Sequence, residues 1–251
     1  MKRVCATLLT CATVGAAIIA PVSYAQASAP VVTLCTRDQH RAVAGPAVIR
    51  NSNSGKQAEC ITNTGGGANF TLSKSAATIP WSAYPNIFRG CEWGVCSSDG
   101  SFPERVSSLH RLTSTWRYSA RASGQWNAAY DIWFDPRPVR GGQVTGTEIM
   151  LWLDVKNMSP VHGWPVLRID GASWQFLHWR TYHNGTSWNY IQFRRVHTDT
   201  YVRNLNLIPF MQRAEASGLL RTSWYLTAVE AGFEICRDGT GLATDTFSVS
   251  R

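Results

Sequence analysis

Lysine is nearly absent from this chain of 251 residues, contributing 4 of the 24 basic side chains against 20 from arginine. No run of positive residues is longer than the pair Arg194 and Arg195. The formal net charge is +8, but a protein that tracks phosphates gathers its charge into a stripe or patch. The scattered arginines therefore argue against nucleic acid as a partner.

The chain also lacks an apolar run long enough for a membrane span. Its N-terminal apolar stretch is interrupted by Pro21 and falls short of the roughly 20 residues that a transmembrane helix needs. Lys2 and Arg3 precede this stretch, and the small residues of a cleavage site follow at 25–27. Residues 1–27 are therefore predicted to be an export signal, and we expect a secreted, extracellular protein with no membrane anchor.

The six histidines do not show the spacing of metal ligands or of a nucleophile triad. In an oxidising compartment the near pairs Cys35 with Cys60 and Cys91 with Cys96 are the natural disulfides, although four cysteines allow three pairings. Cys236 belongs to neither of these pairs. A zinc site at Cys91 and Cys96 is the alternative, but no second ligand pair accompanies them. We expect neither a metal nor a cofactor.

Neither an internal repeat nor a linker rich in Pro, Ser or Thr divides the chain, so residues 28–251 are expected to form a single domain and a monomer. Short apolar runs bounded by Gly, Asn, Ser and Pro predict strands. Their density favours an all-β fold, a two-sheet antiparallel sandwich or jelly roll. The predicted strands span residues 68–72, 107–118, 128–134, 148–153, 173–180, 187–194, 224–234 and 244–249.

One segment predicts a short helix instead. Asn206 can cap it, Pro209 falls in the first turn where proline is tolerated, and Gly218 can end it. Apolar residues follow the helical period at Leu207, Phe210, Met211 and Ala214. We expect this helix to pack against a sheet.

Three predicted strands place acidic and aromatic side chains on one face and aliphatic ones on the other, because successive side chains of a strand alternate. The mixed faces carry Glu148, Met150 and Trp152; Asp131, Trp133 and Asp135; and Trp224, Glu230 and Glu234. Together they predict a concave surface lined with indoles and carboxylates, as in a sugar-binding cleft. Two glutamates on separate strands are the minimum for hydrolysing a glycosidic bond.

These motifs resemble glycoside hydrolase family 12, the small secreted endo-β-1,4-glucanases and xyloglucanases, especially its actinobacterial branch. The resemblance runs from about Cys35 to the C-terminus and rests on YPNIFRGCEWGVC, AYDIWFDP, TEIMLWL, the 160–163 turn, SWYLTAVEAGFE and GLATDTFSV. It implies a concanavalin-like jelly roll with a concave substrate cleft, retaining stereochemistry and no metal. By this resemblance Glu148 is the nucleophile, Glu234 the general acid/base and Asp131 the residue that orients the nucleophile.

Other residues are expected to contact substrate. Met150 and Trp152 would lie at the cleavage point, with Trp133, Glu230 and Asn51 as further contacts, and a structural role is the alternative for each. Glu230 lies about 13 Å along the strand from Glu234, too far to join the chemistry. The remaining tryptophans include Trp93, Trp126, Trp174, Trp179 and Trp188, of which we expect a few at most to stack on sugar rings.

Two positions depart from the family pattern. Ser54 stands where relatives typically carry the Trp of Asn-Asn-x-Trp-Gly, so the indole that stacks on the sugar at the non-reducing side is missing. Cys236 stands where relatives often have Trp, and strand parity places it on the face of Glu234. These changes bear on affinity or substrate preference rather than on the reaction.

The leading hypothesis is a secreted retaining endo-β-1,4-glucanase that hydrolyses cellulose-like or mixed-linkage β-glucans by double displacement. One alternative is a xyloglucan-specific endoglucanase of the same family. The other is a non-catalytic carbohydrate-binding jelly roll, which needs no paired carboxylates and is therefore disfavoured by Glu148, Glu234 and Asp131.

Overall fold

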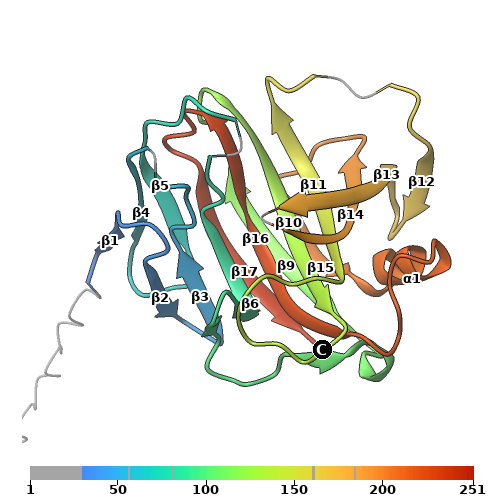
Figure 1. Cartoon of the computed structure of the whole chain (residues 1–251). Helices are drawn as coiled ribbons and strands as arrows, with labels where there is room; N and C mark the ends of the chain where they lie inside the picture. Colours follow the sequence, from blue (N-terminus) through green and yellow to red (C-terminus); the bar gives the residue numbers. More distant parts are fainter. Residues whose placement is uncertain (1–29, 56, 81, 160–161, 184) are drawn as a thin grey trace, which may run out of the picture.

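A computed structural model describes residues 30–55, 57–80, 82–159, 162–183 and 185–251, so the predicted export signal at 1–27 lies outside the described residues. Two β-sheets pack face to face, and one α-helix lies at the edge of the molecule (Figure 1). The predicted all-β jelly roll with one short helix is confirmed. In the described residues no helix has both the length and the apolar character to cross a membrane.

The smaller sheet has six strands and forms the back of the molecule. Its order is β1 (Val32–Leu34), β4 (Glu59–Asn63), β5 (Phe70–Ser75), β17 (Ala243–Ser250), β9 (Thr113–Ser119) and β15 (Tyr201–Asn206). Neighbouring strands in this sheet are all antiparallel, as the β-sandwich prediction requires.

The larger sheet has eleven strands and carries the conspicuous acidic residues. Its order is β12 (Val166–Ile169), β13 (Ala172–His183), β14 (Thr186–Arg195), β11 (Thr147–Lys156), β10 (Gln125–Asp135), β16 (Tyr225–Arg237), β6 (Asn86–Glu92), β3 (Ala47–Arg50) and β2 (His40–Val43), with β7 (Val95–Cys96) beside β6 and β8 (Glu104–Arg105) beside β16. Among its described pairings only β11 with β14 is parallel.

The hydrophobic core lies between the two sheets and takes one face of each long strand. On β11 the side chains of Ile149, Leu151 and Leu153 are fully buried in this core. Met150 and Trp152, on the other face, belong to a separate small apolar cluster with Ala129 and Tyr190. The alternation predicted for this strand is therefore confirmed, and it leaves the acidic face directed away from the core.

The backbone of β16 lies so close to the chain just before β6 that one position of β16 has no room for a side chain. A Cβ atom at Gly232 would lie 2.4 Å from the carbonyl oxygen of Pro85, a separation that would displace the chain leading into β6. Gly232 thus allows β16 and β6 to pair on this side of the larger sheet. Glu230 and Glu234 flank it at two residues on either side.

The helix α1 (Ile208–Ala216) packs against the core face of the larger sheet, as predicted. The N-cap residue is Leu207 rather than the predicted Asn206, but the side chain of Asn206 accepts a hydrogen bond of 3.1 Å from Ile208 N at the start of the helix. Phe210 makes edge-to-face contacts with Trp174 of β13 and Phe193 of β14. Gly218 follows the helix with a φ of +70°, which suits a residue without a side chain.

Both predicted disulfides are present. Cys35 is bonded to Cys60, and Cys91 is bonded to Cys96, whereas Cys236 is buried in β16 outside either bond. The first disulfide joins the residue directly after β1 to β4. The second closes the hairpin of β6 and β7 beside the acidic face of the larger sheet.

Two strand predictions need correction. The strand predicted at 107–118 begins only at Thr113, because Val106–Ser108 forms a short 3-10 helix. Val106 N and Ser107 N there donate to backbone oxygens of a distant loop, at Trp224 and Thr222, so tertiary contacts replace strand pairing. The second correction concerns strands absent from the prediction, which are short or lack strict alternation; they are β1, β2, β3, β4, β6, β7, β8, β12 and β15.

Candidate active site

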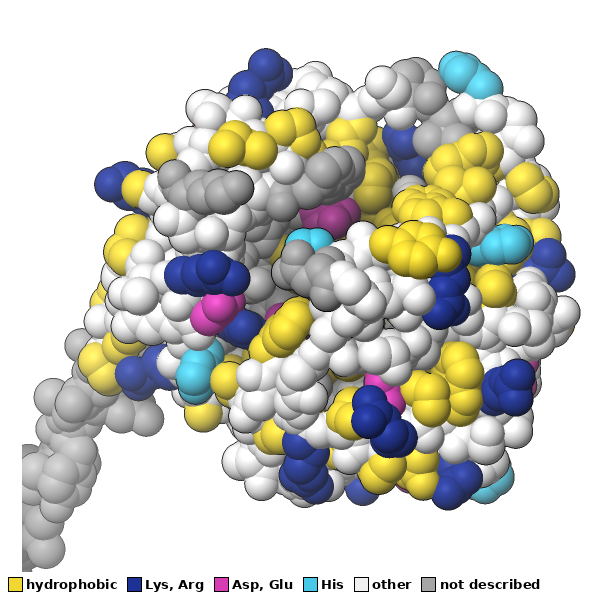
Figure 2. All heavy atoms as spheres, in the orientation of Figure 1, with side chains coloured by type: hydrophobic (Ala, Val, Ile, Leu, Met, Phe, Trp, Pro, Cys, Tyr) yellow, Lys and Arg dark blue, Asp and Glu magenta, His cyan; other side chains and the backbone are white. Residues whose placement is uncertain are grey.

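A cavity of about 440 Å³ lies on the outer face of the larger sheet and contains both Glu148 and Glu234. The space-filling view shows an acidic side chain in a hollow of this face, with hydrophobic side chains along its upper and right edges (Figure 2). The other lining residues are Trp152, Trp179, Thr181, Trp188, Tyr190 and Gln192. Two carboxyl groups from β11 and β16 therefore open into one aromatic-walled space.

Glu148 is held by a neighbouring indole. Trp188 Nε1, on β14, donates a hydrogen bond of 2.5 Å to Oε2 of Glu148. The parallel pairing of β11 with β14 sets Glu148 opposite Tyr190, two residues from Trp188 on the same face. Burial raises the pKa of Glu148 to about 8, while the Trp188 hydrogen bond opposes this rise and the charge of Glu234 adds to it.

Glu234 has a comparable environment on β16. Asn127 Nδ2 of β10 donates a hydrogen bond of 2.5 Å to Oε2 of Glu234. Burial raises the pKa of Glu234 to about 7, and the Asn127 hydrogen bond opposes the rise. Because the charges of Glu148 and Glu234 repel, the pair loses its protons in two linked steps rather than independently.

Asp131 lies on β10, the strand between those that carry the two glutamates. It is 7% exposed and is paired across the sheet with Met150 of β11 and Glu230 of β16. Burial, and then the charges of Glu148, Glu230 and Glu234, raise its pKa well above the usual range of an aspartate. Its Oδ1 has no hydrogen-bond partner among the described residues.

Met150 and Trp152 both occupy the acidic face, but at different depths. Trp152 lines the cavity of Glu148 and Glu234, whereas Met150 is 2% exposed and lies beneath it. The hydroxyl of Tyr190 donates to Sδ of Met150 at 3.2 Å. Met150 therefore supports the wall of the cavity, and Trp152 forms part of its surface.

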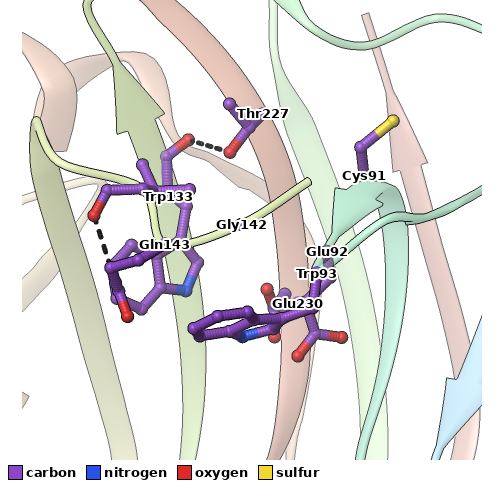
Figure 3. A pocket seen from close by; sticks show the side chains of 9 residues that line it. Cys91, Glu92, Trp93, Trp133, Gly142, Gln143, Thr227 and Glu230 are labelled. Atoms are coloured by element: carbon purple, nitrogen blue, oxygen red, sulfur yellow. Dashed lines mark hydrogen bonds between the residues drawn. The ribbon is translucent and has the colours of Figure 1, made fainter. Parts of the chain in front are cut away.

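Trp133 and Glu230 line a separate cavity of about 20 Å³, large enough for about one water molecule. Figure 3 shows the indole of Trp93 beside Glu230 in this small cavity. Glu230 is 1% exposed and accepts a hydrogen bond of 2.7 Å from Asn86 Nδ2. The expectation that Glu230 contacts substrate is therefore wrong for this structure, because its carboxyl group is buried behind the main cavity.

The carboxyl group of Glu230 belongs to a buried polar cluster. Asn86 Nδ2 also lies 3.4 Å from Oε1 of Glu92, and Arg50 forms an ion pair of 3.2 Å with that same oxygen. Arg50 in turn pairs with Asp38 at 3.0 Å. Burial, and then the charge of Glu92, raise the pKa of Glu230, while the charge of Arg50 opposes this rise.

The expectation for Asn51 is also wrong. Its side chain is fully buried and donates to backbone oxygens of Glu59, at 3.0 Å, and of Thr36. These bonds join two segments near the Cys35–Cys60 disulfide, so Asn51 has a structural role. Ser54, three residues later, is partly buried, and its backbone N–H bonds to Ser82 O at 2.8 Å.

The tryptophans divide between core and cavity in a way that the sequence did not resolve. Trp126 and Trp174 are fully buried in the core. Trp188 and Trp179 line the cavity, and the Trp179 ring stacks at 4.0 Å on Tyr190 while remaining 43% exposed. Trp179 and Trp188 are therefore placed where an indole could meet a sugar ring, and stacking on substrate stays a prediction.

Several polar residues of the site were not anticipated. Tyr190 and Gln192 lie in the strand predicted at 187–194, and Asn127 lies one residue before the strand predicted at 128–134, but no sequence motif distinguishes them. Their strand parity is the one usable signal. Gln192 and Tyr190 alternate with the core residues Ile191 and Phe193 and so face the cavity.

A sequence model described as Glycosyl hydrolase family 12 matches residues 48–250. The solved structure of a metagenome-derived glycoside hydrolase family 12 endoglucanase is similar at a TM-score of 0.81 and 37% identity, covering 88% of this chain and 98% of that one. Endoglucanase cel12A from Rhodothermus marinus is similar at a TM-score of 0.79 and 36% identity, with 87% and 98% covered.

A curated relative adds a match by sequence. Endoglucanase S from Pectobacterium parmentieri is 33% identical over 158 residues, which cover 61% of this chain. The match covers 60% of the Pectobacterium protein. With the family model spanning most of the chain and a fold shared with family 12 endoglucanases, this protein belongs to glycosyl hydrolase family 12 and is a glycoside hydrolase.

Proposed function

We propose that this protein is a secreted retaining endo-β-1,4-glucanase in which Glu148 is the nucleophile and Glu234 the general acid/base. The observation that carries the proposal is that these two carboxyl groups, from β11 and β16, open into the same cavity and feel each other's charge. Retaining hydrolysis needs two carboxyls about 5 to 5.5 Å apart, one on each side of the bond to be broken.

In the first step Glu148 attacks the anomeric carbon as the glycosidic C–O bond breaks, and Glu234 gives its proton to the departing oxygen. This step needs the negative charge on Glu148 and the proton on Glu234. Burial raises both pKa values, to about 8 for Glu148 and about 7 for Glu234, so the pair keeps a proton near neutral pH and the resting enzyme favours that proton on Glu148. The reactive form has the proton on Glu234 instead, and the Trp188 hydrogen bond stabilises the charged Glu148 of that form.

In the second step Glu234, now ionised, takes a proton from a water molecule. The oxygen of that water attacks the anomeric carbon, the ester bond to Glu148 breaks, and the product keeps the β configuration. Asp131 orients Glu148 in this proposal, because it is a buried acid on the intervening strand and its pKa responds to the charge of Glu148.

The substrate class follows from the wall of the cavity. Trp152, Trp179 and Trp188 offer apolar faces for pyranose rings, and Gln192 and Thr181 offer hydrogen bonds to hydroxyl groups. The similar structures named above are endoglucanases, which favours an unbranched β-1,4-glucan. Two disulfides suit an oxidising compartment, and hence secretion.

Glutamine variants test the assigned roles. We expect Glu148→Gln to abolish release of reducing ends from carboxymethylcellulose and barley β-glucan while binding of cello-oligosaccharides persists. The matched control is Glu215→Gln on α1, which should leave turnover unchanged. Full activity of Glu148→Gln would contradict the proposal.

Stereochemistry and substrate need separate readouts. The first product of cellohexaose, followed by NMR before mutarotation, should be the β anomer, and an α anomer would contradict retention. Glu234→Ala with added azide and an activated aryl cellobioside should give the β-glycosyl azide. Faster hydrolysis of xyloglucan than of barley β-glucan would instead favour the xyloglucan-specific alternative.

A further inference from the structure

A second cavity, of about 340 Å³, adjoins the cavity that contains Glu148 and Glu234. The two share Trp152 and Gln192 in their walls, so they form one continuous groove along the outer face of the larger sheet. The second cavity lies beside the loop between β11 and β12 and is also lined by Trp164, Arg194 and Cys236. Its volume is at the lower end of the range for small-molecule sites.

Trp164 is the distinctive residue of this cavity. It is partly buried and lies at the end of the loop, immediately before Pro165. The carbonyl oxygen of Pro165 accepts a hydrogen bond of 2.9 Å from Phe176 N of β13, which ties this end of the loop to the sheet. Because proline has a fixed φ and its oxygen is bonded, the backbone next to Trp164 is held before any ligand arrives.

Arg194 fixes the other end of the same loop. Its Nη1 donates a hydrogen bond of 3.1 Å to the backbone oxygen of Ser159. A guanidinium has five N–H donors, so Arg194 can also donate to a ligand in the cavity that it lines. Gln192, which is 3% exposed, and Gln125 add amide groups to the wall. The cavity thus combines two indoles with several hydrogen-bond donors.

The margin of the cavity formed by β16 carries a small residue. Cys236 lines the cavity, and Ser54 lies near the same margin, since Asn53 pairs with Ala83 and Ala83 pairs with Ile235. An indole at either Ser54 or Cys236 would narrow this space. In this chain the aromatic surface of the cavity comes from Trp164 of the loop and Trp152 of β11.

We propose that this second cavity binds a glucosyl unit of the polysaccharide, with Trp164 as the aromatic platform that the ring packs against. The C–H face of a β-glucosyl ring is apolar and fits an indole, while its equatorial hydroxyls reach Gln192, Gln125 and Arg194 at the ring edge. This inference rests on the proposed glucanase function and assigns to Trp164 a share of substrate affinity.

Binding without turnover tests the platform. In the Glu148→Gln background, calorimetry with cellobiose, cellotetraose and cellohexaose should give affinities that rise with chain length. Trp164→Ala should lower the affinity for cellohexaose about tenfold, as loss of one aromatic contact does. Trp164→Phe should retain most of that affinity. Tyr201→Ala, on β15 of the smaller sheet, is the matched exposed aromatic control and should change nothing.

The outcomes separate the two proposals. If cellohexaose binds and Trp164→Ala binds it equally well with an unaltered melting temperature, the inference about Trp164 is wrong while the glucanase proposal stands. If Trp164→Ala loses affinity equally for cellobiose and cellohexaose, the indole does not belong to a separate outer subsite, and the inference is again wrong. If the Glu148→Gln protein binds no cello-oligosaccharide and the wild type cleaves none, both proposals fail.

Discussion

Trp188 Nε1 and Glu148 Oε2 are joined by a hydrogen bond of 2.5 Å between two strands that run parallel. An N–H group aimed at a buried carboxyl stabilises its ionised form, which is the form that attacks carbon in the proposed reaction. The bond therefore gives an indole of the cavity wall a second role besides contact with sugar.

The Trp188 bond leads to a prediction about rate and pH. Trp188→Phe keeps an aromatic ring but removes the donor, so the pKa of Glu148 should rise and the charged nucleophile should become rarer. We expect kcat/KM on barley β-glucan to fall about 10- to 100-fold, because a hydrogen bond to a charged group contributes about 1.5–3 kcal/mol. The acidic limb of the pH profile should move to higher pH.

Trp179→Phe is the matched control, because Trp179 lines the same cavity and retains its ring stacking on Tyr190 when shortened. Its pH profile should coincide with that of the wild type. An unchanged acidic limb in Trp188→Phe would show that the indole acts only through packing.

Asn127 allows the same argument at the other carboxyl group. Asn127→Leu has a similar volume but donates no hydrogen bond to Glu234, so the pKa of Glu234 should rise above its value of about 7. Because the first step needs a protonated Glu234, the decline of activity on the alkaline side should begin at higher pH. The measurement is kcat/KM against pH between 5 and 9.

The control is Asn63→Leu, another fully buried asparagine, which bonds to backbone oxygens of Gly67 and Asn69 in the smaller sheet. It should lower stability without moving either limb. An alkaline limb that stays in place in Asn127→Leu would mean that another group sets it.

Glu59 should make folding stability depend on pH. It is 3% exposed, its Oε1 has no hydrogen-bond partner among the described residues, and burial raises its pKa to about 8. The folded protein therefore keeps a proton that the unfolded chain releases above its ordinary pKa. The stability this provides is present at acidic pH and is lost as pH rises from about 4.5 to 8.

Urea unfolding at pH 5, 6, 7 and 8 measures this effect. The free energy of unfolding should fall by at most about 1.4 kcal/mol per pH unit from this one carboxyl group. Glu59→Gln should flatten the dependence, whereas Glu104→Gln, in the surface pair with Arg251, should not. Equal slopes in wild type and Glu59→Gln would contradict the assignment.

The two disulfides should differ in their contribution to stability. Cys35 and Cys60 are separated by 25 residues, and Cys91 and Cys96 by only 5. Since a longer loop loses more entropy in the unfolded chain when it is closed, removing the first should cost about 3.5 kcal/mol and removing the second about 2 kcal/mol. Urea unfolding of the two double serine variants checks the order, and the reverse order would contradict the loop-entropy argument.

Strand parity explains most of what could be predicted about the site. On β11 the alternation of Ile149 and Leu151 with Glu148, Met150 and Trp152 follows from the backbone of any strand, so the face of each side chain could be predicted. The alternation of side chains along a strand does not predict how deeply each one is buried. Met150 lies below the surface that Trp152 forms because Tyr190 of β14 packs against it.

The mistaken contacts have a common physical cause. Glu230 shares the face of Glu234, but its carboxyl group is buried and accepts a hydrogen bond from Asn86 of β6, which is 144 residues away in the chain. Asn51 was expected in the cleft from its place in a motif, yet it bonds to the backbone at Glu59 and Thr36. In both cases the partner belongs to a segment whose position depends on sheet order.

Local periodicity was enough to predict the all-β sandwich, the single helix and the faces of the long strands, and close spacing of the cysteines favoured the two disulfide pairs that the structure contains. The tertiary structure decided which groups stabilise the two glutamates. Trp188 reaches Glu148 across 40 residues of chain, and Asn127 reaches Glu234 across 107. Such contacts depend on strand order and register, which result from packing of the whole core and have no local sequence signal.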